Sequence, residues 1–389
     1  MLDVSEARAR LLGSLTPAPI QSRTVALDNA AGAISAQDVL ALVPSPPYRR
    51  AVMDGYACRA ADLPGPLPVA FEVPAGSGVT QLSSGQCARI FTGAPVPEGA
   101  DVVVPQENLR GLDGGATLDP SDQAWIRPVG DDIAVGQTLV REGQRLGPAE
   151  LGVLASGGHA QVSIQVPLRV GLLTTGDEVQ SPGAPLAPGQ IHNSNAPSLM
   201  ALLRGWGVQV THQHIPDSLE STTGALRDAA VHHDLVLTVG GVSAGDYDWV
   251  RPAIESLGRI ESYKVKMKPG KPFAFGTIDS TPVCCLPGNP ASAFVTSLLF
   301  VRPVIRALTG QPTDAMTLPV TAKFETEPAQ RRRFLRVRWD GDGIVAHPNQ
   351  DSGSMTPLVW GTGLAEIPPD TAVSLGDTLV YWPFSELLF

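Results

Sequence analysis

The spacing of apolar residues predicts a helix at the start of the chain and short strands soon after it. Val4, Ala7 and Leu11 recur at helical spacing behind Asp3, a residue type that favours a helix start. From about residue 44 to residue 146, β-rich runs such as PVAFEV and DVVVP are separated by Gly, Pro and Asp turns. The pattern therefore predicts an amphipathic helix followed by a small all-β module.

A second short helix is predicted at the end of this β-rich stretch. Pro148 suits the first turn of a helix, and Leu151 and Leu154 follow at helical spacing. We expect this helix to pack beside the first one, which would make the β-module an insertion between two helices.

From residue 169 to residue 310 the pattern alternates between strand-like and helix-like runs. The strand-like runs RVGLLTT, VQVTHQHI, DLVLTV and PVCCL are each followed by a helical run. Repeated β-α units are typical of a parallel, doubly wound sheet. A strand-turn-strand segment, YKVKMKPGKPFAFGTI, precedes the last unit. Beyond about residue 312 the chain returns to strands, which favours a small barrel or sandwich.

Composition narrows the class of protein. The 389 residues are 43% hydrophobic and 17% charged, and no uncharged apolar run of 18 residues could span a bilayer. The 28 Lys and Arg residues against 38 Asp and Glu leave a net charge of −10, which argues against a general nucleic-acid binder. The first residues carry acids and no apolar signal segment, so a cytoplasmic protein is expected. Four cysteines without a C-x-x-C pair are expected to be reduced and buried.

Four loops that follow the predicted strands carry the candidate chemistry. In an open parallel sheet, ligands bind beyond the carboxyl ends of the strands. The loops at 176–178, 217–218, 240–248 and 287–292 are rich in glycine, hydroxyl and acidic residues. Glycines and hydroxyls ahead of helices offer backbone N–H groups and a positive dipole end. Phosphate or another oxyanion is therefore the expected ligand.

Carboxylates at the same edge would repel a phosphate unless a cation lies between them. They are Asp177, Glu178, Asp217, Asp246 and Asp248. Hard carboxylate and phosphate oxygens are the usual ligands of Mg²⁺. Alternating Lys264, Lys266 and Lys268 on one face of a strand, with Lys271 after a Pro-Gly turn, would add charge that holds anions. The combination predicts phosphoryl or nucleotidyl chemistry.

Each feature also has a purely structural interpretation. GGVSAG alone could be a plain turn, Asp217 and Asp248 could cap helices, and the lysine stripe could be a solvated face. His212 and His214 could share a face, but without a third ligand nearby a non-metal role is favoured. Five arginines are expected to decorate an exposed strand: Arg331, Arg332, Arg333, Arg336 and Arg338.

Seven motifs follow one another along nearly the whole chain. They are MDGYA (53–57), IFTGAPVPEGAD (90–101), TTGDEV (174–179), NSN (193–195), GGVSAGDYDW (240–249), KMKPGKPFAFG (266–276) and LPGNPAS (286–292). In this order and spacing they resemble the MoeA family of molybdopterin molybdenumtransferases, and they are similar to the gephyrin E domain.

The resemblance implies a multidomain α/β plus β fold, assembled as an elongated homodimer. The implied parts are an extended N-terminal helical domain (1–43 with 144–168), an inserted β-rich domain (44–143), a MogA-like doubly wound parallel α/β domain (169–312) and a C-terminal β-barrel domain (313–389).

The resemblance also implies an activity. It is the insertion of molybdate into adenylylated molybdopterin with Mg²⁺ or a similar divalent ion, which releases AMP as the final step of molybdenum cofactor biosynthesis. A molybdopterin adenylyltransferase and molybdoenzymes would be partners, with no role for nucleic acid or a membrane.

Site residues are carried over by motif. The implied catalytic residues are Asp54, Thr92, Asp132, Glu178, Asp217 and Asp248, with Asp54 and Thr92 reaching the α/β loops of the other subunit. Glu178, Asp246 and Asp248 are expected to hold the metal ion. Substrate contacts are expected from Gly240, Gly241, Ser243, Gly245, Lys268, Lys271, Pro287, Gly288, Asn289, Pro290 and Ser292. Because the reaction is ligand exchange plus anhydride cleavage, positioning and electrostatics should carry it without a nucleophilic residue.

Two functions of other kinds remain open. The α/β domain alone resembles adenylyltransferases that make the AMP adduct, and release of pyrophosphate from ATP would favour that activity. A dimeric scaffold is the other alternative, because the related gephyrin also clusters receptors.

Overall fold

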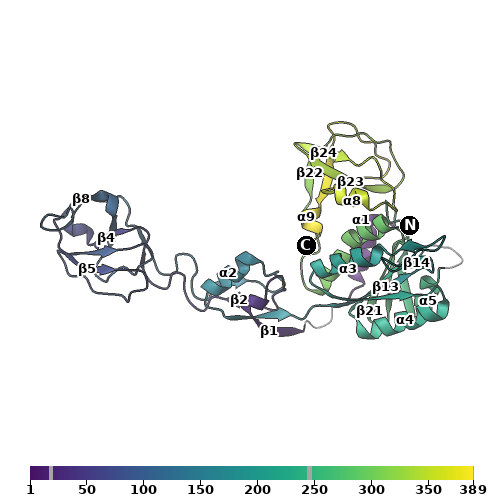
Figure 1. Ribbon diagram of the computed structural model, residues 1–389, viewed down its shortest axis with the longest axis horizontal. Helices are drawn as coiled ribbons and strands as arrows, with labels where there is room; N and C mark the ends of the chain where they lie inside the picture. Colours follow the sequence, from purple (N-terminus) through teal and green to yellow (C-terminus); the bar gives the residue numbers. More distant parts are fainter. Residues whose placement is uncertain (17–20, 243–247, 389) are drawn as a thin grey trace. The chain divides into compact units, whose positions relative to one another are not determined.

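The computed structural model describes residues 1–16, 21–242 and 248–388, which form two compact units (Figure 1). The larger unit comprises residues 1–21 and 165–389, and the smaller unit comprises residues 22–164. Each has hydrophobic cores of its own. The boundaries of the four domains implied by the resemblance stay a prediction.

A six-stranded sheet forms the centre of the larger unit, in the order β16-β13-β17-β21-β20-β18. Its strands are β13 (Arg169–Thr175), β16 (Gln209–Ile215), β17 (Leu235–Val239), β18 (Gly258–Tyr263), β20 (Ala274–Ile278) and β21 (Thr281–Leu286). The first four in this order are parallel to one another, and β20 runs antiparallel to both of its neighbours, β21 and β18. The predicted doubly wound sheet is confirmed. Of the predicted strand-turn-strand segment, only β20 joins this sheet as a whole strand, because its partner β18 ends at Tyr263, where the segment begins.

Helices cover both faces of this sheet. They are α1 (Val4–Gly13), α3 (Asn195–Gly205), α6 (Pro290–Thr296), η4 (Ser297–Val301) and α7 (Arg302–Leu308) on one face, and α4 (Leu219–His232) and α5 (Val250–Leu257) on the other. In Figure 1, α1 and α3 lie above the strands and α4 and α5 below. Neighbouring Leu172 and Leu173 of β13 belong to the two opposite cores, as the alternation of side chains along a strand requires.

One helical stretch of the larger unit, Pro290–Leu308, is long and apolar enough to cross a membrane by length and composition alone. It is 78% buried inside the protein, with Phe300 and Val301 fully enclosed. A buried core helix can have the same length and composition as a membrane-spanning helix, and the burial of this stretch identifies it as a core helix.

The first helix forms as the apolar spacing predicts. Asp3 caps α1, because its side chain accepts a hydrogen bond from the Ser5 amide at 3.0 Å. Ala7 and Leu11 are buried in a core of the larger unit. Helix α2 (Pro148–Ser156) instead places Leu154 in a core of the smaller unit. The two helices thus contribute to the cores of different units, and their packing side by side stays a prediction.

The C-terminal strands close into a barrel at the top of the larger unit in Figure 1. They are β22 (Leu318–Ala322), β23 (Arg332–Asp340), β24 (Gly343–Ala346), β25 (Gly363–Ile367) and β26 (Thr378–Pro383), with helices α8 (Thr356–Trp360) and α9 (Phe384–Leu387). The pairing runs β23-β24-β22-β26-β25 and returns to β23, so the barrel is closed. The short strand β19 (Met267–Lys268) adds to β23. The predicted C-terminal barrel is confirmed.

The smaller unit is built mainly from short strands. They are β1 (Ser22–Ala26), β2 (Val39–Leu40), β3 (Arg50–Ala51), β4 (Gly55–Cys58), β5 (Val69–Val73), β6 (Cys87–Ile90), β7 (Val102–Pro105), β8 (Leu109–Gly111), β9 (Thr117–Leu118), β10 (Ile126–Arg127), β11 (Thr138–Val140) and β12 (Gln161–Gln165). A four-stranded sheet, β5-β6-β4-β7, is its largest, and one core of the unit lies on it. The predicted all-β module is present.

The four cysteines are free and buried, as expected. Burial raises the pKa of Cys58 to about 12 and that of Cys87 to about 11. Such thiols stay protonated at neutral pH and are unreactive.

Candidate active site

Loops at the carboxyl edge of the central sheet enclose a cavity of about 610 Å³. The loops follow β13, β16, β17 and β21, the four parallel strands. Ten of the predicted site residues line this cavity: Glu178, Asp217, Gly240, Gly241, Asp248, Pro287, Gly288, Asn289, Pro290 and Ser292. The convergence of the four loops, on which the sequence argument depended, is therefore present, while the roles of the individual residues stay predictions.

The paired glycines after β17 are required by local crowding. Gly240 and Gly241 have φ angles of +89° and +64°, in the region that glycine adopts without strain. A Cβ at Gly240 would lie 2.9 Å from the Thr175 hydroxyl, and one at Gly241 would lie 2.7 Å from a methyl of Val250. A Cβ at Gly288 would meet the Cα of Gly240 at 3.6 Å. Glycine is therefore required at positions 240 and 241, while a Cβ at Gly288 would make only an ordinary contact.

Two asparagines of the NSN motif hold the cavity in shape, a role that the sequence argument did not assign. Asn193 donates to the Thr174 hydroxyl at 3.1 Å and accepts from the Ala196 amide at 2.9 Å, at the start of α3. Asn195 donates to the Gly288 carbonyl at 2.7 Å. The signal was available, because asparagines between a strand and a helix commonly bond to nearby backbone.

The PGNP loop is also tied to the barrel. Asn289 donates to the Ser352 hydroxyl at 2.9 Å, and the Ala291 amide donates to the Ser352 carbonyl at 3.0 Å. Asn289 therefore acts as a bridge between two parts of the larger unit, in addition to lining the cavity.

Acidic side chains dominate the charge of the cavity. Glu178, Asp217 and Asp248 line it, yet no group of three His, Cys, Asp or Glu residues among the described part of the chain lies close enough to hold a metal ion by itself. Ser243, Gly245 and Asp246 lie outside the described residues, so the predicted metal set is visible only at Glu178 and Asp248.

The predicted anion-holding lysines do not line this cavity. Val265 and Met267 are buried while Lys266 and Lys268 are less so, which agrees with the predicted alternation, although the strand is broken at Lys264, where φ is +84°. Lys268 lines a separate cavity of about 410 Å³ against the barrel. Lys271 is exposed next to Pro272, which does line the acidic cavity.

The arginine strand differs from the expectation. Arg336 of β23 is 1% exposed, and it is hydrogen-bonded to the segment that contains Gln350 and Asp351. It donates to the Asp351 carbonyl at 3.0 Å, and burial lowers its pKa to about 10. The prediction of an exposed arginine strand is wrong at Arg336 and holds at Arg338. Arg336 lines the same cavity as Lys268.

The helix-cap interpretation of Asp217 is also wrong. Helix α4 is capped by Ser218, whose hydroxyl accepts from the Ser221 amide at 3.1 Å. The residue before α5 is Trp249, and it makes no side-chain cap. Both aspartates line the cavity.

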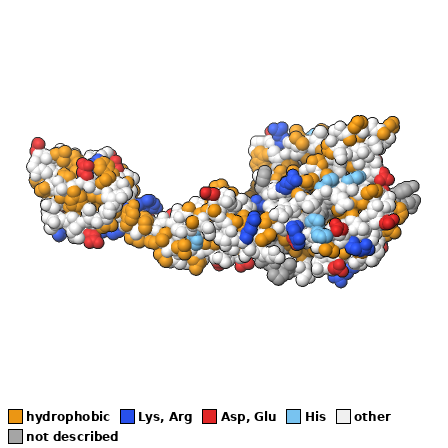
Figure 2. Space-filling model, turned by 60° about the horizontal axis from the view of Figure 1, so that its bottom comes forward, with side chains coloured by type: hydrophobic (Ala, Val, Ile, Leu, Met, Phe, Trp, Pro, Cys, Tyr) orange, Lys and Arg blue, Asp and Glu red, His pale blue; other side chains and the backbone are white. Residues whose placement is uncertain are grey.

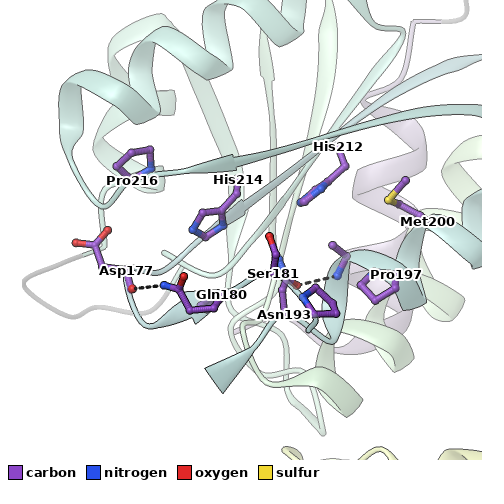
Figure 3. A pocket seen from close by; sticks show the side chains of 12 residues that line it. Asp177, Gln180, Ser181, Asn193, Pro197, Met200, His212, His214 and Pro216 are labelled. Atoms are coloured by element: carbon purple, nitrogen blue, oxygen red, sulfur yellow. Dashed lines mark hydrogen bonds between the residues drawn. The ribbon is translucent and has the colours of Figure 1, made fainter. Parts of the chain in front are cut away.

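A neighbouring cavity of about 460 Å³ contains the two histidines of β16 (Figure 3). The Thr174 hydroxyl lies 2.9 Å from Nε2 of His212 and 3.1 Å from Nδ1 of His214. Although His212 is largely exposed, partial removal from water, followed by the nearby His214, lowers its pKa. Both imidazole rings therefore share the Thr174 hydroxyl as a hydrogen-bond partner.

The remaining predicted residues belong to the smaller unit. Asp54 accepts hydrogen bonds from the backbone amide and the hydroxyl of Thr92, both at 2.7 Å. These bonds lower the pKa of Asp54. Asp132 is exposed, and its backbone amide donates to the Ser45 carbonyl at 3.0 Å. Hydrogen bonds between Asp54 and Thr92 thus join two of the motifs, MDGYA and IFTGAPVPEGAD.

Charged side chains of both signs are mixed on one face of the larger unit. On the face drawn in Figure 2, basic and acidic side chains of the larger unit are interspersed and form no single basic patch. This distribution agrees with the net charge of −10.

Fold and cavity together define a multidomain protein whose α/β part holds a glycine- and carboxylate-lined site at the edge of a parallel sheet. Residues 2–158 match the model of the MoeA N-terminal region (domain I and II), and residues 319–384 match that of the MoeA C-terminal region (domain IV). Residues 171–307, which include the cavity, match a model described as a probable molybdopterin binding domain. The chain belongs to the MoeA family.

Relatives agree with this assignment. The chain is 37% identical over 382 residues to molybdopterin molybdenumtransferase 2 of Mycobacterium tuberculosis, covering 92% of this chain and 94% of that protein. It is 32% identical over 362 residues to gephyrin of Dictyostelium discoideum, covering 80% of this chain and 50% of that protein. A molybdopterin biosynthesis MoeA protein from Pyrococcus horikoshii superposes with a TM-score of 0.83 at 28% identity, over 99% of each chain. The family and fold class expected from the sequence are confirmed.

Proposed function

We propose that this protein is a molybdopterin molybdenumtransferase, which inserts molybdate into adenylylated molybdopterin and releases AMP as the last step of molybdenum cofactor biosynthesis. The observation that carries the proposal is the cavity at the carboxyl edge of the sheet. It unites Glu178, Asp217 and Asp248 with the Gly240–Gly241 turn, within the segment that matches a molybdopterin binding domain. Homologues that are named for this activity support the proposal.

The residues of the cavity suit anhydride cleavage without a covalent intermediate. No cysteine is among the described residues that line it, and His192, a histidine of that lining, is bonded through Nε2 to the Ala184 carbonyl at 3.0 Å. Glycine turns allow a phosphate to approach the backbone, and a site held by Asn195 and Asn289 is arranged before substrate arrives. Gly240 donates its own amide to the Leu286 carbonyl, so the amide of Gly241 is the better candidate to contact a phosphate oxygen.

Mg²⁺ fits the donors that line the cavity. This ion usually takes one or two carboxylates, with substrate phosphate oxygens and waters completing its shell. Glu178 and Asp248 supply two carboxylates, which agrees with the lack of a three-residue cluster among the described residues. When bound, Mg²⁺ would withdraw charge from the phosphoanhydride oxygens and make AMP a better leaving group. Glu178 and Asp248 would hold it, and Asp217 would orient the nucleotide end.

The activity is tested with purified protein, adenylylated molybdopterin and molybdate. We expect AMP release that requires both molybdate and Mg²⁺, stops with EDTA, and yields a cofactor that activates an apo-molybdoenzyme. Release of pyrophosphate from ATP and molybdopterin, without molybdate-dependent AMP release, would overturn the proposal in favour of an adenylyltransferase.

A homodimer with composite sites is part of the same proposal. The Asp54–Thr92 pair presents a carboxylate and a hydroxyl held in one fixed geometry, which suits contact with substrate. We assign this pair to the cavity of the other subunit, in a two-fold dimer with two equal sites. A cytoplasmic location and transfer between an adenylyltransferase and molybdoenzymes complete the proposal.

A further inference from the structure

Two loops of the cavity leave the central sheet side by side. Strands β13 and β16 are parallel neighbours, and their last residues, Thr175 and Ile215, are paired in register. Asp177 and Asp217 each follow two residues later. The two aspartates therefore start at the same level beyond the sheet.

These aspartates bond to each other's backbone in a reciprocal arrangement. The Asp177 amide donates to Oδ2 of Asp217 at 3.1 Å, and the Asp217 amide donates to Oδ1 of Asp177 at 3.1 Å. Each carboxylate thus accepts the N–H of the other residue, and the two loops are joined by a closed pair of hydrogen bonds. Charged acceptors make such bonds stronger than bonds between neutral groups.

Only one of the two aspartates lines the acidic cavity. Asp217 does so together with Glu178, the residue that follows Asp177. Asp177 lines the neighbouring cavity, where Figure 3 shows its side chain on the loop beside Gln180. Its carbonyl accepts from the Gln180 side chain at 3.4 Å, which further fixes the turn. Asp177 thus lies between two residues of the cavity without lining it.

We infer that Asp177 is a positioning residue of the active site, which sets Asp217 and Glu178 by joining the loops after β13 and β16. The inference rests on the proposed function of the cavity. Its carboxylate acts as a hydrogen-bond acceptor for the Asp217 amide, and the same bond pair fixes the backbone from which Glu178 projects. Small displacements of reacting groups cost large factors in rate, so the expected effect is on kcat rather than on binding.

The chemistry of the bond pair predicts how substitutions differ. Asp177→Ala removes the acceptor and frees the Asp217 amide. Asp177→Asn keeps an oxygen at the same place and loses only the charge. We expect Asp177→Ala to lower kcat by about 10- to 100-fold with KM changed less than about threefold. Asp177→Asn should restore at least half of that loss on a logarithmic scale. Asp228→Ala, on the exposed face of α4, is the matched control and should leave kcat unchanged.

A double variant tests whether Asp177 acts through its partner. A chain that already carries Asp217→Ala has lost one bond of the pair and the carboxylate that Asp177 positions, so adding Asp177→Ala should lower kcat less than about threefold further. Independent, multiplying losses would overturn the inference, as would full activity of Asp177→Ala. Equal loss in Asp177→Asn and Asp177→Ala would show a role for the charge and would overturn it too.

Hydrogen exchange separates this inference from the proposed function. In wild type, the Asp217 amide should exchange more slowly than in Asp177→Ala, by about 3- to 10-fold, and Asp177→Asn should retain the protection. If wild type releases no AMP but shows this exchange pattern, the proposed function fails while the joined loops stand. If AMP is released and the Asp217 amide exchanges at the same rate in all three proteins, the joined loops fail and the function stands.

Discussion

In the larger unit, ten predicted site residues from four loops line one cavity, whereas in the smaller unit Asp54 and Thr92 bond to each other on a turn of a β-sheet domain. The cavity follows from topology, because the carboxyl ends of parallel strands must open at one edge. The Asp54–Thr92 pair instead joins two turns at the ends of the paired strands β4 and β6. The difference indicates that the larger unit forms a cavity from its own loops, while the smaller unit contributes one hydrogen-bonded pair of polar side chains, Asp54 and Thr92.

The largest effect is expected from the carboxylates of the cavity. Glu178→Gln should lower AMP release by about 10²- to 10³-fold, because it removes a charge that would hold the metal ion while keeping the shape of the side chain. Unfolding by urea should be unchanged, since Glu178 is exposed at the edge of the sheet. Glu220→Gln, exposed in the first turn of α4, is the control and should keep full activity. A Glu178→Gln enzyme with normal rate and normal Mg²⁺ dependence would remove this residue from the site.

A mixed-dimer experiment tests whether the two regions complete one site. If Asp54→Ala and Asp248→Ala are each inactive, subunit exchange in equal amounts should return about a quarter of wild-type activity. About half of the dimers are then mixed, and each mixed dimer contains one intact and one doubly damaged site. AMP release after verified exchange is the measurement. Mixtures that stay inactive would place the two residues in one chain's site and break the comparison.

The sequence predicted the sheet of the larger unit and the loops at its edge better than the contacts between distant segments, for a physical reason. Alternating apolar runs determine the doubly wound sheet, and the sheet places the loops that contain Glu178 and Gly240. The hydrogen bond of Asn195 to the Gly288 carbonyl joins residues far apart in the chain, and no pattern of apolar and polar residues predicts it. Burial of Arg336 depends on its contacts with Gln350 and Asp351, which an arginine-rich strand does not suggest. The core that α1 joins could not be predicted, because an amphipathic helix specifies an apolar face but not its partner.

A pair of glycine substitutions compares crowding in the two units. Gly240→Ala should cost about 2 kcal/mol of the free energy of unfolding, because its positive φ and the Thr175 hydroxyl at 2.9 Å from a new Cβ act together. Gly76→Ala, in the smaller unit, has nearly the same φ of +86° and open space, and should cost about 1 kcal/mol from backbone strain alone. Hydrogen exchange under native conditions reports each unit by itself. Equal costs would mean that the loop after β17 relaxes around the added methyl.

The smallest expected effect is a difference in pH dependence between the units. The pKa of His212 is lowered in the folded protein, by partial removal from water and then by His214, from the ordinary value of 6.5. A histidine with a lowered pKa binds fewer protons when folded, so its contribution is complete above about pH 6.5 and is lost as the pH falls through its folded pKa. The pKa of Asp54 is lowered from 3.8, so its contribution persists down to that pH and is lost only below it. Between pH 7.5 and pH 5.5 the larger unit should therefore lose protection against hydrogen exchange while the β-sheet around Asp54 does not.

His212→Gln should reduce this dependence of hydrogen exchange on pH in the larger unit, because a neutral amide can still bond to the Thr174 hydroxyl without titrating. A slope that is the same in wild type and His212→Gln would assign the pH dependence to other groups.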